Sequence, residues 1–275
     1  MEAATTELAP LTPARRETRI EALLREAGEL TRFTGQSIAA LVRTPRYTAE
    51  ILRQAAILVR GTTPLMFVMN AFFGCSIMSF AFFFLRSIGA SDFAGVPVAF
   101  ADLRVGAPLM FGYVFASKVC CGFVAEIGAM KINEELDAYE SNGVDPLRYV
   151  VGTRILAVAI FLPIGCAVSL VGELAGNYLL GVVVLHGISG QGFLQLFWGA
   201  QGLSDQFLVF VGQAVLALSV AVVACFYGLR TAGSSAAVGD SVARSLVVNL
   251  VLVHLYTGFF VVLFYGVNLH MSIGG

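Results

Sequence analysis

The chain has 275 residues, of which 57% are hydrophobic and 13% are charged, and its formal net charge is −1. Its mean hydropathy of +0.82 lies far above the usual range of soluble globular domains. The composition predicts an all-α protein that crosses a membrane several times. Nucleic-acid binding is not expected, because the sequence has no basic patch interleaved with aromatic residues.

The first 60 residues predict a cytoplasmic N-terminal region with amphipathic helices. Apolar residues from Ile20 to Val42 follow helical spacing and are flanked by arginines, a pattern typical of a helix in the plane of the membrane interface. The alternative is a cytosolic helix that packs on a partner. Thr44 and Pro45 break this helix. Residues 1–19 lack the apolar core of a signal peptide, so the N-terminus is expected to stay in the cytoplasm.

Residues 61–275 form the expected membrane domain, with five stretches long and apolar enough to cross about 30 Å of hydrocarbon. The predicted spans cover approximately residues 64–85, 104–125, 149–175, 207–229 and 246–267. Residues 86–103 and 186–206 are expected to be loops outside the membrane.

Basic residues decide the topology of the long apolar stretch at 149–185, which has room for one span or for a hairpin of two. One span places nearly all Arg and Lys on the cytoplasmic side. A hairpin would instead place Arg230 and Arg244 outside and leave residues 186–206 inside without a basic residue. The prediction is therefore a cytoplasmic N-terminus and a periplasmic C-terminus.

A polar segment between the second and third spans is expected to lie outside the hydrocarbon, because each charge inside the hydrocarbon would cost roughly 2.5–3.5 kcal/mol. One helix is predicted over about residues 126–142, with Ile132, Leu136 and Tyr139 on one face. Residues 141–143 predict its end, and residues 145–146 predict the start of the next helix. The charged residues of this helix are Glu126, Lys131, Glu134, Glu135, Asp137 and Glu140.

Three polar residues, Glu173, Asn249 and His254, are predicted within or near the hydrocarbon, where ionisable groups point to function. The alternative for Glu173 is a position near the outer end of its span, where water or a neighbour satisfies it. The alternative for His254 is a neutral histidine that is hydrogen-bonded across helices. Gly172 and Gly176 form a pair that would allow two helices to approach closely.

No enzyme motif is found. The sequence has no zinc-protease, serine-hydrolase or P-loop motif, so the chain is expected to be no enzyme, to hold no cofactor and to draw its energy from elsewhere. The five cysteines lie in apolar stretches without metal-ligand spacing and are expected to be small buried hydrophobes.

Residues 125–154 resemble the signature of the MlaE/YrbE family, the permease subunits of bacterial ABC lipid transporters that work with MCE-domain proteins. Weaker similarity extends over most of residues 60–270. The residues that fit the family pattern, in order, are Ala125, Glu126, Ile127, Gly128, Met130, Glu134, Leu136, Val144, Asp145, Pro146, Leu147, Arg148 and Arg154.

The resemblance implies a location in the bacterial inner membrane and partners of several kinds. These are a second permease, two ATPase subunits that bind ATP and magnesium, MCE-domain proteins, and a lipid, fatty acid or sterol as substrate. It also implies that residues 126–142 are a coupling helix seated in a groove of the ATPase. The expected coupling residues are Glu126, Gly128, Lys131, Glu134, Glu135, Leu136, Tyr139, Asp145, Pro146 and Arg148.

Two departures from the family pattern favour a pair of different permeases. Val105 stands where a glutamate is expected after Arg104, and Ser117 and Lys118 replace a Gly-Arg pair. Arg104 is expected to meet an anionic head group, and the phenylalanine-rich first span is compatible with an acyl or sterol cavity. The lipid-binding candidates are Arg104, Pro108, Phe73 and Phe80.

Two other functions compete with ATP-driven transport. One is a structural membrane anchor of an envelope complex that has no transport activity of its own. The other is a proton-coupled carrier, which would depend on Glu173 or His254 and not on ATP.

Overall fold

The computed structural model describes residues 19–42 and 44–265, and every regular element within these ranges is a helix. The fold class predicted from composition is therefore confirmed for the described chain. The principal helices are α1 (Arg19–Leu41), α2 (Thr48–Ser87), α3 (Gly95–Ala101), α4 (Ala107–Val114), α5 (Cys121–Ile132), α6 (Glu135–Ser141), α7 (Thr153–Tyr178), α8 (Gly190–Gly199), α9 (Leu203–Leu229) and α10 (Ser235–Tyr265).

Short 3-10 and π-helical turns join several of these helices into longer rods. The connecting turns are Thr44–Tyr47, Ser91–Ala94, Asp102–Gly106, Phe115–Cys120, Leu147–Gly152 and Leu179–Val184. Counted with these turns, five helical segments are long and apolar enough to cross a membrane, as predicted. They are Thr44–Ser87, Ser91–Ile132, Leu147–Val184, Leu203–Leu229 and Ser235–Phe264.

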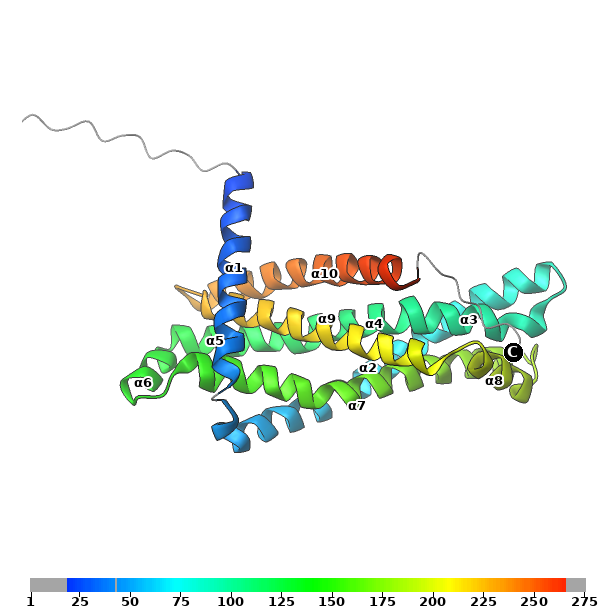
Figure 1. The fold of residues 1–275 in the computed structure, drawn as a ribbon, viewed down its shortest axis with the longest axis horizontal. Coiled ribbons are helices and arrows are strands. Elements are labelled where there is room, and N and C mark those ends of the chain that lie inside the picture. Colours follow the sequence, from blue (N-terminus) through cyan, green and yellow to red (C-terminus); the bar gives the residue numbers. More distant parts are fainter. Residues whose placement is uncertain (1–18, 43, 266–275) are drawn as a thin grey trace, which may run out of the picture.

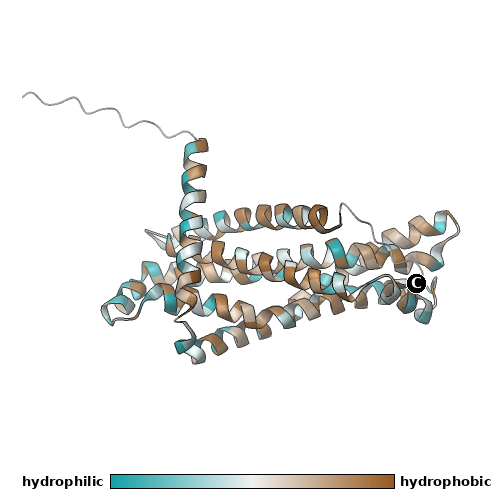
Figure 2. Cartoon of the chain, in the orientation of Figure 1, coloured by the Kyte–Doolittle hydropathy of each residue, from teal (hydrophilic) through white to brown (hydrophobic). Residues whose placement is uncertain are grey.

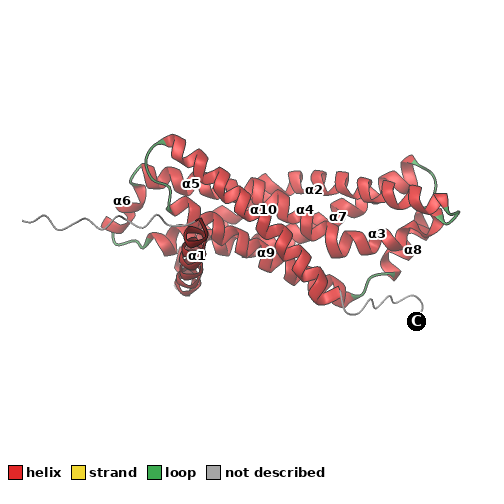
Figure 3. Cartoon of the chain, turned by 90° about the horizontal axis from the view of Figure 1, so that it is seen from above, coloured by secondary structure: helices red, strands yellow, loops and turns green. Residues whose placement is uncertain are grey.

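The five long segments run along the longest axis of the molecule, and α1 lies across them (Figure 1). The short helix α6 lies at one end of this bundle, and α3 and α8 lie at the other end. Hydrophobic residues follow the long segments, whereas hydrophilic residues gather on α6 and recur along α1 (Figure 2). The view from above shows the same bundle joined by short loops at both ends (Figure 3).

The prediction of loops at residues 86–103 and 186–206 is wrong, because both stretches are mainly helical. A turn with Gly89 at φ +75° is followed at once by helix from residue 91. Pro97 lies in the first turn of α3, where its missing N–H costs no hydrogen bond. The helices α3 and α8 pack on each other through a second apolar core that contains Val98, Phe193 and Phe197. This long-range contact outweighs the local Gly, Pro and Ser content on which the loop prediction relied.

The closest helix pair is α2 and α7, which meet through glycines. A methyl group at Gly176 would overlap the backbone carbonyl of Ala71, and one at Gly172 would come within 2.8 Å of the carbonyl oxygen of Phe67. The predicted role of these two glycines in close helix approach is confirmed. Gly74 supplies a third contact, because a methyl group there would overlap the carbonyl of Glu173.

We expect Gly176→Ala to destabilise the fold by about 1–3 kcal/mol, because the added methyl group pushes two backbones apart. Gly258→Ala is the matched control, since no atom lies within 4 Å of its added methyl group and alanine favours the helix. Thermal unfolding of the purified full-length chains in detergent measures both effects. Equal melting temperatures for the two variants would contradict the glycine contact.

Candidate functional site

The polar segment between the second and third spans is held by a tight turn on each side of α6. On its N-terminal side, Glu134 adopts a left-handed conformation with φ 60°. On its C-terminal side, Gly143 has φ 74°, and the N–H of Val144 donates to the carbonyl of Tyr139 at 2.9 Å. This hydrogen bond and the left-handed glycine are typical of the Schellman motif that ends helices. Asp145 then caps the next helix by accepting the N–H of Leu147 at 2.9 Å.

The single helix predicted over residues 126–142 is therefore wrong in its extent. Residues 126–132 belong to α5 and continue the second span, whereas α6 is a separate helix of seven residues. The left-handed Glu134 reverses the chain between them. Such a conformation is uncommon for a residue other than Gly, Asn or Asp, so the local sequence gave little sign of it. The predicted stop at residues 141–143 and the restart at Asp145 are confirmed.

The inner face of α6 is anchored in the protein. Leu136 is only 4% exposed and belongs to the main apolar core. The ring of Tyr139 lies 5.0 Å from that of Tyr149, which in turn lies 5.1 Å from the ring of Tyr47. These contacts connect α6 to the start of the third span and to the connection between α1 and α2. The exposed acids of this segment are Glu134, Glu135, Asp137 and Glu140.

An ion pair joins the second and third spans close to α6. Arg154 Nη2 lies 2.7 Å from Glu126 Oε1, and the arginine side chain is 3% exposed while the glutamate side chain is 47% exposed. Arg154 also donates from Nη1 to the carbonyl of Val150 at 2.9 Å. The pair fixes the relative position of α5 and α7 where both helices reach the polar end of the bundle.

The remaining coupling residues predicted from the sequence lie at the same end, and most of them contact other parts of the chain. Lys131 pairs with Asp137 at 3.2 Å, and Arg148 pairs with Asp145 at 3.0 Å. Gly128 of α5 allows the connection after α9 to approach α5 closely, since a methyl group on Gly128 would lie 3.0 Å from an atom of Thr231. A groove of about 200 Å³ lies beside α6, lined by Lys131, Leu136, Asp137, Glu140, Asp145, Pro146, Leu147 and Leu229.

The lipid-binding candidate Arg104 is buried in the second span and has a counterion within the protein. Its Nη2 lies 3.8 Å from Asp205 Oδ2 of α9, and its guanidinium lies 4.5 Å from the ring centroid of Phe100. Pro108 is buried at the start of α4. Asp205 was absent from the residues singled out in the sequence, because nothing in the local pattern shows that α9 meets Arg104.

The two phenylalanine candidates lie on α2 and differ in exposure. Phe73 is half-buried, whereas Phe80 is 77% exposed and stacks on Phe84 with ring centroids 6.3 Å apart. Phe80 lines a groove of about 280 Å³ between α2 and α3, together with Phe84 and Pro97. Phe73, Arg104 and Pro108 do not line this groove, so the structure does not bring the four candidates into one cavity.

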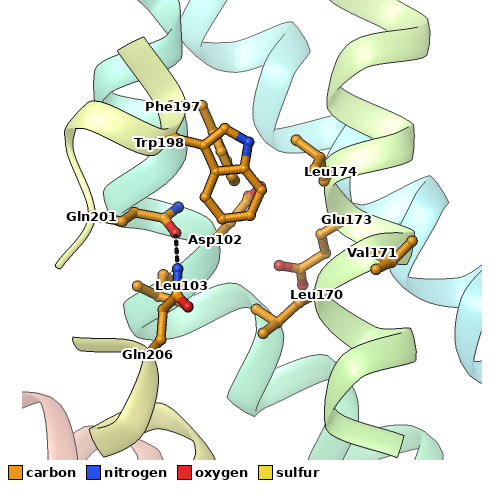
Figure 4. Close-up of a pocket in the computed structure, with 10 residues that line it drawn as sticks. All are labelled: Asp102, Leu103, Leu170, Val171, Glu173, Leu174, Phe197, Trp198, Gln201 and Gln206. Carbon is orange, nitrogen blue, oxygen red and sulfur yellow. Dashed lines mark hydrogen bonds between the residues drawn. The ribbon is translucent and has the colours of Figure 1, made fainter. Parts of the chain in front are cut away.

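A second polar site, which was not predicted from the sequence, lies near the opposite end of the bundle. Asp102 and Glu173 are 2% and 1% exposed, respectively, and both line a cavity of about 110 Å³ (Figure 4). Asn177 donates to Asp102 and, at 2.8 Å, to the carbonyl of Glu173. Neither carboxylate oxygen of Glu173 has a hydrogen-bond partner among the described residues. The sequence pattern places Asp102 in a predicted loop, and only Glu173 of the two acids is a candidate from the sequence.

His254 forms the interhelical hydrogen bond that its alternative interpretation predicted. Its Nε2 lies 2.6 Å from the hydroxyl of Tyr113, so the contact joins α10 to α4. The five cysteines are free thiols, of which three are buried and two are half-buried.

The family model of the permease MlaE matches residues 51–263, most of the chain. The chain belongs to the MlaE permease family. This assignment confirms the resemblance found in the sequence signature. The match begins within α2, so α1 lies outside it.

Similar proteins carry the name "probable ABC transporter permease protein". One from Synechocystis sp. is 30% identical over 167 residues, which cover 61% of this chain and 63% of the relative, or less than two thirds of its length. One from Rickettsia typhi is 24% identical over 80% of this chain and 85% of the relative. One from Porphyra purpurea is 27% identical over 78% of this chain and 81% of the relative. The family match and the names of these relatives support a permease subunit of an ABC transporter, a class of protein that works with separate ATPase subunits.

We expect Glu126→Gln to destabilise the permease more than Arg154→Met does. Removing the glutamate leaves the buried arginine without its ion-pair partner; breaking a fully buried pair costs about 3–5 kcal/mol, and the cost here is smaller because water reaches Glu126. Removing the arginine leaves a glutamate that water already reaches. Thermal unfolding in detergent compares the single variants with the double variant, which should recover part of the loss. The reverse order of the single variants would contradict this account.

Proposed function

We propose that the permease moves a lipid across the bacterial inner membrane and that a cytoplasmic ATPase drives it by docking on α6. The observation that supports this proposal is the geometry of α6, a short helix with exposed acids held by tight turns between two spans. A short helix with a buried inner face and a charged outer face fits a groove of another protein.

The packing of α6 gives force from a docked ATPase a path into the membrane. Leu136 is buried in the core, so displacement of α6 must move the residues around it. The ion pair between Glu126 and Arg154 links α5 to α7, and the glycine contacts link α7 to α2. Three of the five long segments would therefore respond together to a push on α6.

We expect the exposed acids around α6 to determine which surface of the ATPase binds there, because a surface of opposite charge is attracted to them. The acids exposed on this segment, Glu134, Glu135, Asp137 and Glu140, would meet a basic groove on the ATPase. ATP and magnesium would bind to the ATPase subunits, since no P-loop motif occurs in this chain.

The orientation proposed for the permease places α6 and α1 on the cytoplasmic side and the C-terminal end of α10 on the periplasmic side; the C-terminus itself lies outside the described residues. Basic residues support it, since Lys131, Arg148, Arg154, Arg230 and Arg244 all occur in segments on the α6 side. The helix α1 is tied to α9 on that side, where Glu29 pairs with Arg230 and Glu26 accepts the hydroxyl of Tyr227. The position of α1 across the spans supports a location in the plane of the interface (Figure 1).

A second permease and MCE-domain proteins complete the proposed assembly. An ABC transporter needs two membrane halves, and the departures at Val105 and at residues 117–118 favour two different permeases in one complex. Large apolar side chains exposed on α2 and α10 support contact with lipid or with another permease. The MCE-domain proteins would pass the lipid to or from the permease on the periplasmic side.

We expect the double variant Glu135→Lys/Glu140→Lys to lose ATPase docking, because it reverses two exposed charges without touching the core. The ATPase that co-purifies with the tagged full-length permease should fall at least tenfold, and lipid transport should fall with it. Asp92→Lys is the control, since it reverses an exposed charge at the opposite end of the bundle. Leu136→Asp is unsuitable as a docking test, because it places a charge in the core.

If the double variant transports lipid at the normal rate and co-purifies with the normal amount of ATPase, docking on α6 is contradicted.

Mass spectrometry of the unmodified complex, purified in mild detergent from its own host, tests which partners bind the permease. A P-loop ATPase, a second MlaE-type chain and MCE-domain proteins are the expected co-eluting proteins. Their absence from a folded preparation would favour the structural anchor instead.

A further inference from the structure

The cavity near the end of the bundle opposite α6 is built around two acids from different spans. Glu173 comes from α7, and Asp102 comes from the π-helical turn between α3 and α4. Figure 4 shows the carboxylate of Glu173 pointing into the cavity. The walls come from α7, α8, α9 and the second span, through Asp102, Leu103, Leu170, Val171, Glu173, Leu174, Phe197, Trp198, Gln201 and Gln206.

Three buried acceptor atoms of the two acids that line the cavity lack a hydrogen-bond partner among the described residues, as does Oδ1 of the adjacent Asn177. They are both carboxylate oxygens of Glu173 and Oδ1 of Asp102. Asn177 satisfies only the other oxygen of Asp102. Buried polar atoms in native proteins nearly always have partners, so three unsatisfied acceptors on one cavity point to a ligand that donates hydrogen bonds.

The charges around the cavity determine the sign of that ligand. None of its ten described lining residues is basic. The nearby Arg104 pairs with Asp205 and lies over the ring of Phe100, so its charge is already matched by an acid. An anionic group such as a phosphate would find no basic partner on these walls, whereas a cation would favour the ionised form of the two carboxyl groups and pair with them.

The donors that the cavity needs and its aromatic walls favour an organic cation. The cavity volume of about 110 Å³ has room for a group of several non-hydrogen atoms, since about 10–15 Å³ of such volume admits one water molecule. A primary ammonium carries three N–H donors, which equals the number of unsatisfied acceptors on the two acids that line the cavity. The indole of Trp198 and the ring of Phe197 also line the cavity (Figure 4), and aromatic faces attract such cations.

We propose that this cavity binds a primary ammonium group, with Glu173 as its counterion and Asp102 as a second acceptor. Two sources have this chemistry: the aminoethyl head group of a lipid and a soluble amine. If the source is a lipid, the site narrows the substrate of the proposed transport. Binding at the cavity needs neither ATP nor a partner, so it is tested separately from transport.

Trp198 offers a direct measurement, because it lines the cavity and is the only tryptophan in the sequence. The fluorescence of the purified full-length permease in detergent is titrated with ethanolamine at constant pH and ionic strength. Choline, which has the same charge without N–H donors, and sodium chloride are the comparison ligands. We expect a saturable change with ethanolamine and at least tenfold weaker binding of choline.

Variants assign the response to the acids. Glu173→Gln should weaken ethanolamine binding at least tenfold, whereas Asp92→Asn, which removes an exposed acid outside the cavity, should leave binding unchanged. Asp102→Asn serves as the second test if Glu173→Gln does not fold. Should neither fold, the comparison of ethanolamine with choline and sodium on the unmodified chain decides.

Lipids distinguish the two sources. Mixed micelles with phosphatidylethanolamine should saturate the response if a lipid head group is the ligand, and those with phosphatidylcholine or phosphatidylglycerol should not. If only free ethanolamine binds, the source is a soluble amine. The proposal is overturned if neither ethanolamine nor phosphatidylethanolamine gives a saturable response, if choline or sodium acts equally well, or if a folded Glu173→Gln variant binds like the unmodified chain.

Discussion

The structure depends on the direct backbone contact between α2 and α7. Three glycines, Gly74, Gly172 and Gly176, bring the two helices so close that a single methyl group at any of them would press on the facing backbone. Such packing replaces the hydrophobic effect, which does not drive association between helices within a bilayer. It also sets the position of Glu173, whose carbonyl lies against Gly74. The second span packs on both helices of this pair through α4, and α9 packs on α7.

The third span connects two sites of different character. Near its start, Arg154 holds α5 through Glu126 and thereby supports the exposed helix α6. Near its other end, Glu173 faces a mainly apolar cavity that it shares with Asp102. The two residues lie about 28 Å apart along α7 at 1.5 Å per residue. Both residues lie on α7, which carries Pro163 between them, so this helix is the element that connects the polar end with the cavity.

The two sites handle buried charge differently. Arg154 and Arg104 are both buried, and each has an acidic partner from a neighbouring span. Glu173 and Asp102 are at least as deeply buried, yet three of their four oxygens have no partner in the described chain. A buried charge that is paired holds helices together, whereas a buried acceptor without a partner is a place for a ligand. This contrast separates the structural acids of the permease from those assigned to binding.

The sequence by itself determined the properties that depend on local composition. The five spans follow from the length of apolar stretches, the N-terminal helix from its apolar stripe, and the end of α6 from the conformational freedom of Gly143. The signature at residues 125–154 also identified the family.

Only the tertiary structure decided which distant residues meet. The helices in place of the loops at 86–103 and 186–206, the reversal at Glu134, the burial of Leu136 and the pairing of Arg104 with Asp205 all depend on contacts between segments far apart in the chain. The same is true of Asp102 and Glu173, which come from different spans. Hydrophobicity determines whether a segment enters a membrane, but side-chain packing between segments determines its neighbours, and a single sequence shows only the first.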